Sequence, residues 1–239
     1  MFGNPHEMYL ICGFHFKSKI SFFNLMNKCI TISEAASYIK DGMTLMVGGF
    51  MGVGGPNRIM DALVESGVKE LTIICNDTAF PDKGVGKLIV NRQVKRVIAS
   101  HIGTNPATIE LMNSGELTVT FYPQGTLIEC IRACGAGLGG VLTPTGLGTV
   151  IADGKQVISI DGKDYLLEKP IRADVALLHA NVADELGNLI HKGTTQNFNP
   201  IIATAADLVV AEVDEIVPTG SLAPEAIHTP SIFVNYLAK

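Results

Sequence analysis

The residues best suited to chemistry in this chain form a glycine-rich segment directly after an apolar run. Residues 48–56 read GGFMGVGGP, and residues 49–55 hold four glycines in seven positions. Glycine adopts positive φ angles and leaves no Cβ between the main chain and a ligand, so its N–H groups can reach phosphate or carbonyl oxygens. A tight turn between a strand and a helix explains a single glycine, but this density favours a ligand-binding loop.

Two glycine clusters can be compared with nucleotide-binding fingerprints. In the first, Gly52 and Gly54 would need glycine or alanine at position 57, where Asn57 stands, and the Lys-Ser/Thr ending of a P-loop is missing. The second cluster, residues 135–140, fits GxGxxG but follows a predicted helix, whereas the fingerprint must follow a strand. The first loop is therefore not a dinucleotide site, and the second is interpreted as a flexible crossing.

Acid–base or covalent chemistry requires an ionisable side chain that is lifted out of the solvated surface. His101 is the best-placed histidine, but no partner carboxylate is identifiable and a hydrogen bond within its loop is the favoured role. The sequence has no Ser-His-Asp order, Cys-His pair or His-x-x-x-His spacing. We therefore predict no catalytic nucleophile and no metal site in this chain. None of the candidate acidic residues is framed by apolar neighbours: Asp77, Asp82, Glu110, Glu116 and Glu129.

Short apolar runs alternate with helical segments in the first half of the chain, which predicts an α/β fold with a mainly parallel sheet flanked by helices. The predicted strands are residues 44–50, 71–75, 94–100 and 117–122. The predicted helices begin at Thr31, Pro56, Asn105 and just after Pro123. Because ligands bind at the carboxyl ends of parallel strands, we expect the glycine loop, Asn76 and Gln124 at one rim.

The middle of the chain predicts an antiparallel hairpin region. Residues 149–151, 157–160 and 165–168 are short apolar runs, and Asp-Gly turns separate them at positions 153–154 and 161–162. A buried strand over 173–180, a loop between 76 and 86, a helix over 197–206 and a strand over 207–213 complete the prediction.

Composition excludes several classes of partner. The chain has 239 residues, a formal net charge of −5 and only 17% charged residues, which argues against nucleic acid and against an anionic membrane surface. It has no apolar run of about 18 residues. A phosphate-bearing small molecule needs only a few cations, and six lie near the glycine loop in sequence: Arg58, Lys83, Lys87, Arg92, Lys95 and Arg96.

The cysteines indicate a reducing compartment. Five cysteines, with no CxxC pair, predict reduced thiols and a cytoplasmic protein, and Cys130 and Cys134 are expected in the core. The low charge also favours an oligomer. Residues 1–25 stand apart from this pattern. They are predicted to be a disordered extension or to follow a mis-assigned start codon, with the working protein beginning near Met26 and one domain spanning 26–239.

Several motifs together resemble a known family. Asp41-Gly42, Gly48-Gly49-Phe50, Gly54 and Pro56 match the first signature of family I coenzyme A transferases. Further segments resemble the α subunit of acetate or butyrate-acetoacetate CoA-transferases: residues 76–79, 99–106, 123–127, 135–137 and 143–146. The resemblance covers about residues 26–239.

The resemblance implies the fold shared by CoA transferases and sugar-phosphate isomerases, and an α subunit that works in a hetero-oligomer, α2β2 or larger, with a β subunit. In this family a glutamate of the β subunit forms an acyl-glutamyl anhydride and then a glutamyl-CoA thioester. No Glu-Asn-Gly-like segment is present here, in agreement with a separate α subunit. The implied substrates are acyl-CoA and short-chain carboxylic acids such as acetate, butyrate and acetoacetate, with coenzyme A as co-substrate and no cofactor.

Carried over by position, the resemblance places Gln124 beside the acyl group, and Asn76 is predicted as a second supporting residue. The implied CoA-binding residues are Gly48, Gly49, Phe50, Met51, Gly52, Val53 and Gly54. A sugar-phosphate isomerase or a ligand-sensing module of the same fold is the alternative, weakened by the absence of a base. A catalytically silent scaffold is the third hypothesis.

Overall fold

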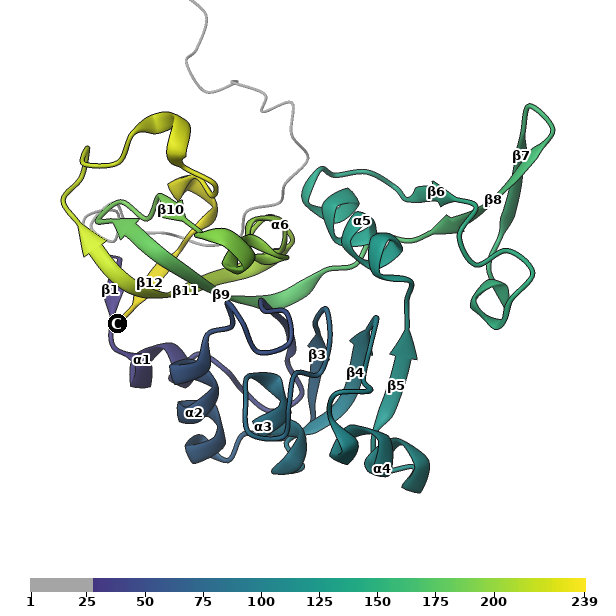
Figure 1. The fold of residues 1–239 in the computed structure, drawn as a ribbon, viewed down its shortest axis with the longest axis horizontal. Helices are drawn as coiled ribbons and strands as arrows, with labels where there is room; N and C mark the ends of the chain where they lie inside the picture. The colour runs from purple at the N-terminus through teal and green to yellow at the C-terminus, as the bar shows by residue number, and fades with distance from the viewer. Residues whose placement is uncertain (1–27) are drawn as a thin grey trace, which may run out of the picture.

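The computed structural model describes residues 28–239, and its centre is a nine-stranded sheet (Figure 1). The strands lie in the order β1-β12-β11-β9-β2-β3-β4-β5, all parallel, and β10 pairs with β9 in the antiparallel direction. The strands are β1 Cys29–Ile30, β2 Thr44–Val47, β3 Leu71–Ile74, β4 Val94–Ala99, β5 Thr118–Phe121, β9 Ala173–Asp184, β10 Leu189–Ile190, β11 Ala206–Val217 and β12 Tyr236–Ala238. This confirms the predicted α/β fold with a mainly parallel sheet.

Helices cover both faces of the sheet. Side chains on successive strand residues point to opposite faces, so a single strand packs against helices on both sides. In β2, Leu45 and Val47 pack into one apolar cluster with α1–α4, and Met46 packs into a second cluster with α5 and α6. The helices are α1 Ile32–Ser37, α2 Asn57–Ser66, α3 Val85–Val90, α4 Pro106–Ser114, α5 Gln124–Gly135 and α6 Asn199–Ile202. Burial on both faces makes the sheet a rigid support for the loops at its edges.

The ends of the helices follow the sequence signals. The Thr31 hydroxyl accepts a hydrogen bond from the Glu34 N–H, and the Glu34 carboxylate accepts one from the Thr31 N–H, which forms the predicted capping box of α1. Asn105 caps α4 through the Ala107 N–H. Gly67 ends α2 at a φ of 69°.

A small antiparallel sheet projects from the rest of the chain (Figure 1). Its strands are β6 Val141–Thr143, β7 Val157–Ile160 and β8 Lys163–Glu168, in the order β6-β8-β7. The β7–β8 hairpin turns at Asp161-Gly162, as predicted. The predicted strand at 149–151 is wrong, because Thr149 accepts the Ile151 N–H and starts a 3₁₀ turn over Val150–Ala152. The third strand is instead β6.

Three further expectations need correction. The predicted loop over 76–86 ends in α3, whose Val85, Leu88 and Ile89 are buried at helical spacing. The predicted helix over 197–206 shortens to α6, preceded by a 3₁₀ turn at Gly193–Gln196. β9 and β11 run on to Asp184 and Val217, beyond the predicted ends, because they pair with each other along their length.

Among residues 28–239, two cysteines lie in the core, whereas Cys134, which was expected there, is only partly buried against it and Cys29 is exposed. Cys75 and Cys130 are buried, and burial raises the pKa of the Cys130 thiol to about 11. Among residues 28–239, no helix is long and apolar enough to cross a membrane. The predictions for residues 1–25 lie outside the described residues.

Candidate functional site

The loops after β2, β3 and β5 meet at one edge of the sheet, as the sequence predicts. β2 pairs with β3, β3 with β4, and β4 with β5, so their carboxyl ends lie side by side. The Gln124 Nε2 donates a hydrogen bond to the Asn76 Oδ1 at 2.9 Å, although the two residues are 48 positions apart. The Ser100 hydroxyl donates to the same Asn76 oxygen at 3.1 Å. Asn76 is thereby fixed as a buried acceptor for the exposed Gln124 amide.

The glycine loop forms a tight two-residue turn. Phe50 and Val53 exchange two backbone hydrogen bonds of 2.9 Å, and Met51 and Gly52 between them have φ angles of 49° and 79°. Positive φ at both central residues is the geometry of a type I′ turn. The apolar side chains at this tip are exposed by 38% at Phe50, 40% at Met51 and 51% at Val53.

Most N–H groups of the glycine loop are used within the chain. The Gly48 N–H bonds to the Leu177 carbonyl at 3.0 Å, and the Gly49 N–H bonds to the Asn197 Oδ1 at 3.0 Å. Within residues 28–239 the N–H groups of Gly52, Gly54 and Gly55 have no hydrogen-bond partner, and of these three residues Gly52 and Gly54 are partly exposed whereas Gly55 is buried. The loop therefore offers a ligand fewer donors than a bare backbone cradle over its full length.

Asp77 holds the turn from the β3 side. Its carboxylate accepts the Met51 N–H at 3.0 Å and the Ala79 N–H at 2.8 Å. Asp77 is only 5% exposed, so the expectation that it lacks a desolvating environment is wrong. Asp77 lines a small cavity together with residues far from it in sequence, among them Gly49 and Gly52 of the glycine loop. A buried carboxylate with amide partners is a structural acceptor for this loop.

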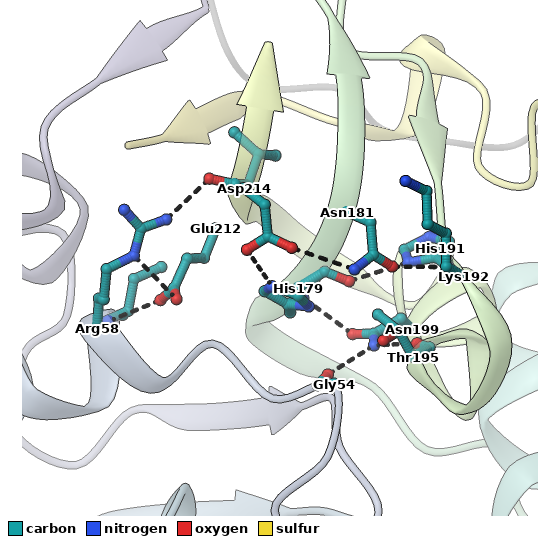
Figure 2. Close-up of polar contacts among 12 residues, drawn as sticks. Gly54, Arg58, His179, Asn181, His191, Lys192, Thr195, Asn199, Glu212 and Asp214 are labelled. Carbon is teal, nitrogen blue, oxygen red and sulfur yellow. Dashed lines mark hydrogen bonds and ion pairs between the residues drawn. The ribbon is translucent and has the colours of Figure 1, made fainter.

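Asn197 and Asn199 hold the other side of the loop, and sequence reasoning missed both. Asn197 lies between a 3₁₀ turn and α6, and its Nδ2 also contacts the Val53 carbonyl at 3.4 Å. Figure 2 shows Asn199 between Gly54 and the strand that carries His179. The only sequence signal is their position beside a proline-containing turn, Asn197-Phe198-Asn199-Pro200.

The start of α2 is fixed by residues of β11. The buried Glu212 carboxylate accepts the Ile59 N–H at 2.9 Å and pairs with Arg58 at 3.2 Å (Figure 2). Arg58 also donates to the Val213 carbonyl at 2.8 Å. A carboxylate at a helix N-terminus satisfies an open N–H and the helix dipole. The glycine loop is thus anchored where it enters α2.

Histidines line the neighbouring wall of β9 and β10. His179 pairs with the exposed Asp214 at 3.0 Å through its Nε2, and Asn181 donates to the same carboxylate at 3.1 Å (Figure 2). His191 follows β10, is 2% exposed, and has a pKa lowered to about 4, because burial disfavours the imidazolium. Its Nδ1 donates to the His179 carbonyl at 2.9 Å, and its Nε2 accepts from the Thr229 hydroxyl at 3.0 Å.

Two further sequence candidates are placed by the structure. His101 is exposed, and its carbonyl accepts the Thr78 N–H at 3.3 Å, so it takes part in its loop through the backbone. Of the cations near the loop in sequence, Lys83 packs against Gly52, where an added Cβ would lie 3.2 Å from the Lys83 Cδ. Four of the other cations pair with acidic side chains: Arg58, Lys87, Arg92 and Lys95.

The chain matches known proteins over almost all of its described length. Residues 29–239 match the family model described as coenzyme A transferase. The chain is 56% identical over 213 residues to the acetate CoA-transferase subunit alpha of Escherichia coli K12, covering 89% of this chain and 97% of that one. It is 52% identical over 213 residues to the acetoacetyl-CoA:acetate/butyrate CoA transferase alpha subunit of Clostridium acetobutylicum, covering 89% and 98%.

Solved structures share the fold. An acyl-CoA transferase from Escherichia coli O157:H7, solved as a thioester complex with CoA, aligns with a TM-score of 0.82 and 24% identity. The alignment covers 90% of this chain and 48% of that one, so this chain spans about half of its length. Glutaconate coenzyme A-transferase from Acidaminococcus fermentans aligns with a TM-score of 0.78 and 20% identity, covering 88% and 75%.

Proposed function

The chain belongs to the coenzyme A transferase family, and we propose that it is the α subunit of a short-chain acyl-CoA:carboxylate CoA-transferase of the acetate, butyrate and acetoacetate type. The names of its two relatives above support this substrate class and imply a β subunit as partner. The proposed assembly is α2β2 or larger and works in the cytoplasm, with acyl-CoA and short-chain carboxylic acids as substrates.

The observation that carries this proposal is the composition of the rim. The Gln124 amide, Asn76 and the glycine loop come together at the carboxyl edge of the sheet. Asp77, the acidic side chain among them, is already occupied by two backbone N–H groups. Such a rim can bind and polarise a substrate, but it needs a nucleophile from elsewhere. We place that nucleophile, a glutamate, on the β subunit.

In the proposed reaction the β-subunit carboxylate attacks the acyl-CoA carbonyl, the CoA thiolate leaves, and an acyl-glutamyl anhydride forms. The thiolate then attacks the glutamyl carbonyl and releases the donor carboxylate, which leaves a glutamyl-CoA thioester. Repeating these steps in reverse with the acceptor acid yields the new acyl-CoA. Coenzyme A is thus a co-substrate, and no cofactor takes part.

This chain contributes binding and charge stabilisation. One N–H of the Gln124 amide is held by Asn76, and the other is available to the carbonyl oxygen that gains charge in each step. The Gly52 and Gly54 N–H groups would bind oxygens of the pantetheine or phosphates, and the neighbouring Lys83 would add a positive charge. The remaining residues of the 48–54 segment shape this surface.

The exposed tip of the glycine loop supports a shared site. Phe50, Met51 and Val53 form an apolar surface next to the proposed CoA-binding amides. Apolar side chains around an active site exclude water from reactive intermediates once they are covered. We propose that the CoA molecule and the β subunit cover them together.

Reconstitution tests the proposal. The purified chain should transfer CoA from acetoacetyl-CoA to acetate only after a β subunit of the same family is added, measured as acetyl-CoA formation. Borohydride should trap the thioester on the β chain and leave this chain unlabelled. Transfer by this chain alone would contradict a split site. Isomerisation of a sugar phosphate by the purified chain would favour the alternative function.

A further inference from the structure

We propose that Asn199 is a positioning residue, which holds the glycine loop in its CoA-binding shape from behind. The inference rests on the proposed function, because it assigns a role to a residue that supports the loop and does not touch the substrate. Asn199 is the first residue of α6 and lies more than 140 positions from the loop in sequence.

Asn199 is fully buried, and its amide is used on both sides. The Oδ1 accepts the N–H of His179 in β9 at 3.1 Å. The Nδ2 donates to the Gly54 carbonyl at 2.9 Å and to the Thr195 carbonyl at 2.8 Å. The side chain is 0% exposed, so its amide would be a buried polar group without a partner if these bonds were absent. One side chain therefore ties the sheet, the turn before α6 and the glycine loop together.

The hydrogen bond to the Gly54 carbonyl fixes one of the two peptide units that flank the Gly54 Cα. A peptide unit is planar, so holding a carbonyl fixes the N–H on the other side of the same unit. Asn199 fixes the Gly54–Gly55 unit, and Asn197 holds the Val53 carbonyl of the preceding unit at 3.4 Å. The Gly54 N–H belongs to that preceding unit, whose carbonyl also accepts the Phe50 N–H at 2.9 Å, and Asn199 holds the unit that follows, so the Gly54 backbone is fixed on both sides of its Cα.

Packing adds a second constraint at the start of the loop. A Cβ on Gly48 would lie 1.8 Å from the Asn199 Oδ1 and 2.6 Å from its Cγ. The main chain of Gly48 thus lies directly against the Asn199 amide, and the absence of a side chain at position 48 allows this approach. Asn199 therefore contacts the loop near both of its ends, at Gly48 and at Gly54.

An asparagine is suited to this position because it has a donor and an acceptor on one planar group. Alanine would remove all three hydrogen bonds. Aspartate would keep the volume but place an oxygen opposite the Gly54 and Thr195 carbonyls, where three acceptors meet without a hydrogen. Both variants should release the loop, and aspartate should do so without leaving a cavity.

The test compares Asn199→Ala and Asn199→Asp with Gln93→Ala in the assembled α/β enzyme. Gln93 is the matched control, because it is also buried and its Nε2 also donates to two backbone carbonyls, those of Leu63 and Val68, at the opposite edge of the sheet. We expect both Asn199 variants to raise the KM for acyl-CoA about tenfold and to change the KM for the acceptor carboxylate less than twofold. Gln93→Ala should change neither KM.

A cycle of double substitutions tests the packing argument. Gly48→Ala should lower kcat/KM for acyl-CoA at least tenfold in the wild-type background. In the Asn199→Ala background, where the clashing atoms are gone, the same change should cost less than about threefold. Equal effects in the two backgrounds, or an unchanged KM for acyl-CoA in both Asn199 variants, would overturn the inference.

Hydrogen exchange separates this inference from the proposed function. Amides of residues 48–55 should exchange at least tenfold faster in Asn199→Asp than in the wild type, and at an unchanged rate in Gln93→Ala. Unchanged exchange in Asn199→Asp would overturn the positioning role even in a fully active enzyme. If the wild-type assembly transfers no CoA but exchange is still faster in Asn199→Asp than in the wild type, the positioning role would be supported and the proposed function rejected.

Discussion

The two edges of the parallel sheet differ in what their polar side chains hold in place. At the carboxyl edge, the buried side chains of Asp77 and Asn199 and the partly exposed side chain of Asn197 hold an uncharged loop with an exposed apolar tip. At the amino edge, exposed ion pairs join the strand ends, as in Arg92 with Glu116 and Lys95 with Glu70. Buried amides at the carboxyl edge hold backbone in an unusual shape, whereas those at the amino edge close ordinary turns. This difference distinguishes a binding edge from a structural one.

The largest contrast is expected between two glycines with the same backbone conformation. Gly54 in the loop has a φ of 68°, and Gly67 at the amino edge has a φ of 69°. An added Cβ would lie 2.6 Å from the Thr195 Cα at Gly54, but would meet no heavy atom within 4 Å at Gly67. Gly67→Ala should cost about 1–2 kcal/mol from the left-handed conformation alone. Gly54→Ala should cost about 1–3 kcal/mol more through overpacking.

Urea denaturation of both variants measures this difference. Equal losses in the free energy of unfolding would show that the loop can shift at no cost, and would remove the distinction between the two edges. The activity of the assembled enzyme provides the second readout. It should fall at least tenfold in Gly54→Ala and remain near the wild-type value in Gly67→Ala, because only Gly54 lies in the proposed site.

The next prediction concerns the dependence of stability on pH, because His191, which follows β10, is a buried ionisable side chain. The folded chain holds His191 at a pKa of about 4, below the ordinary value of 6.5, so only the unfolded chain binds this proton between those values. The contribution of His191 to stability is therefore complete above pH 6.5 and is lost as the pH falls toward 4. The free energy of unfolding should decrease by about 1.4 kcal/mol per pH unit in this window.

His191→Gln should flatten this dependence, at the cost of lower stability at pH 7, where the native imidazole bonds to His179 and Thr229. His101→Gln is the matched control, because the His101 ring is exposed. The measurement is urea denaturation at half-unit steps from pH 4 to 7. A slope that survives in His191→Gln would assign the pH dependence to other groups.

A catalytic prediction follows for the exposed amide of the rim. Gln124→Ala should lower turnover of the assembled enzyme about tenfold or more, because the proposed donor to the reacting carbonyl oxygen is lost. Stability should change little, since Gln124 is exposed. Steady-state rates with acetoacetyl-CoA and acetate measure the effect. An unchanged turnover would remove Gln124 from the site and leave only the glycine loop there.

The sequence predicts the carboxyl edge better than the residues that hold it. Three apolar runs end shortly before the glycine loop, Asn76 and Gln124. These runs do not give the order of the strands in the sheet, but they place the three loops at the carboxyl ends of parallel strands and therefore on one rim. Asn199 and Asp77 depend on contacts between residues far apart in the chain, such as Asn199 with Gly54, and no local pattern encodes them. The sequence does not indicate α3, because Val85-Gly86-Lys87-Leu88-Ile89-Val90 is too short for a clear helical period.

The antiparallel arm shows the same limit. Its Asp161-Gly162 turn is a local signal and was predicted, whereas the partner of β8 on the other side is β6, nearly 20 residues earlier in the chain. The run at 149–151 resembles a strand by composition, but the Thr149 hydroxyl starts a 3₁₀ turn there. A local hydrogen bond from a threonine side chain competes with strand pairing. Whether the segment forms a strand or a turn then depends on whether a partner strand lies beside it.

The smallest effect is expected for an exposed ion pair at the amino edge. Lys95 and Glu70 form a 2.6 Å ion pair, but their side chains are 68% and 60% exposed. Water and salt screen such pairs, so Lys95→Ala should lower the free energy of unfolding by less than about 1 kcal/mol, and 1 M salt should remove most of that difference. The KM for acyl-CoA should not change. If it did, charge at the structural edge would influence CoA binding across the sheet, and the separation of the two edges into binding and structural roles would fail.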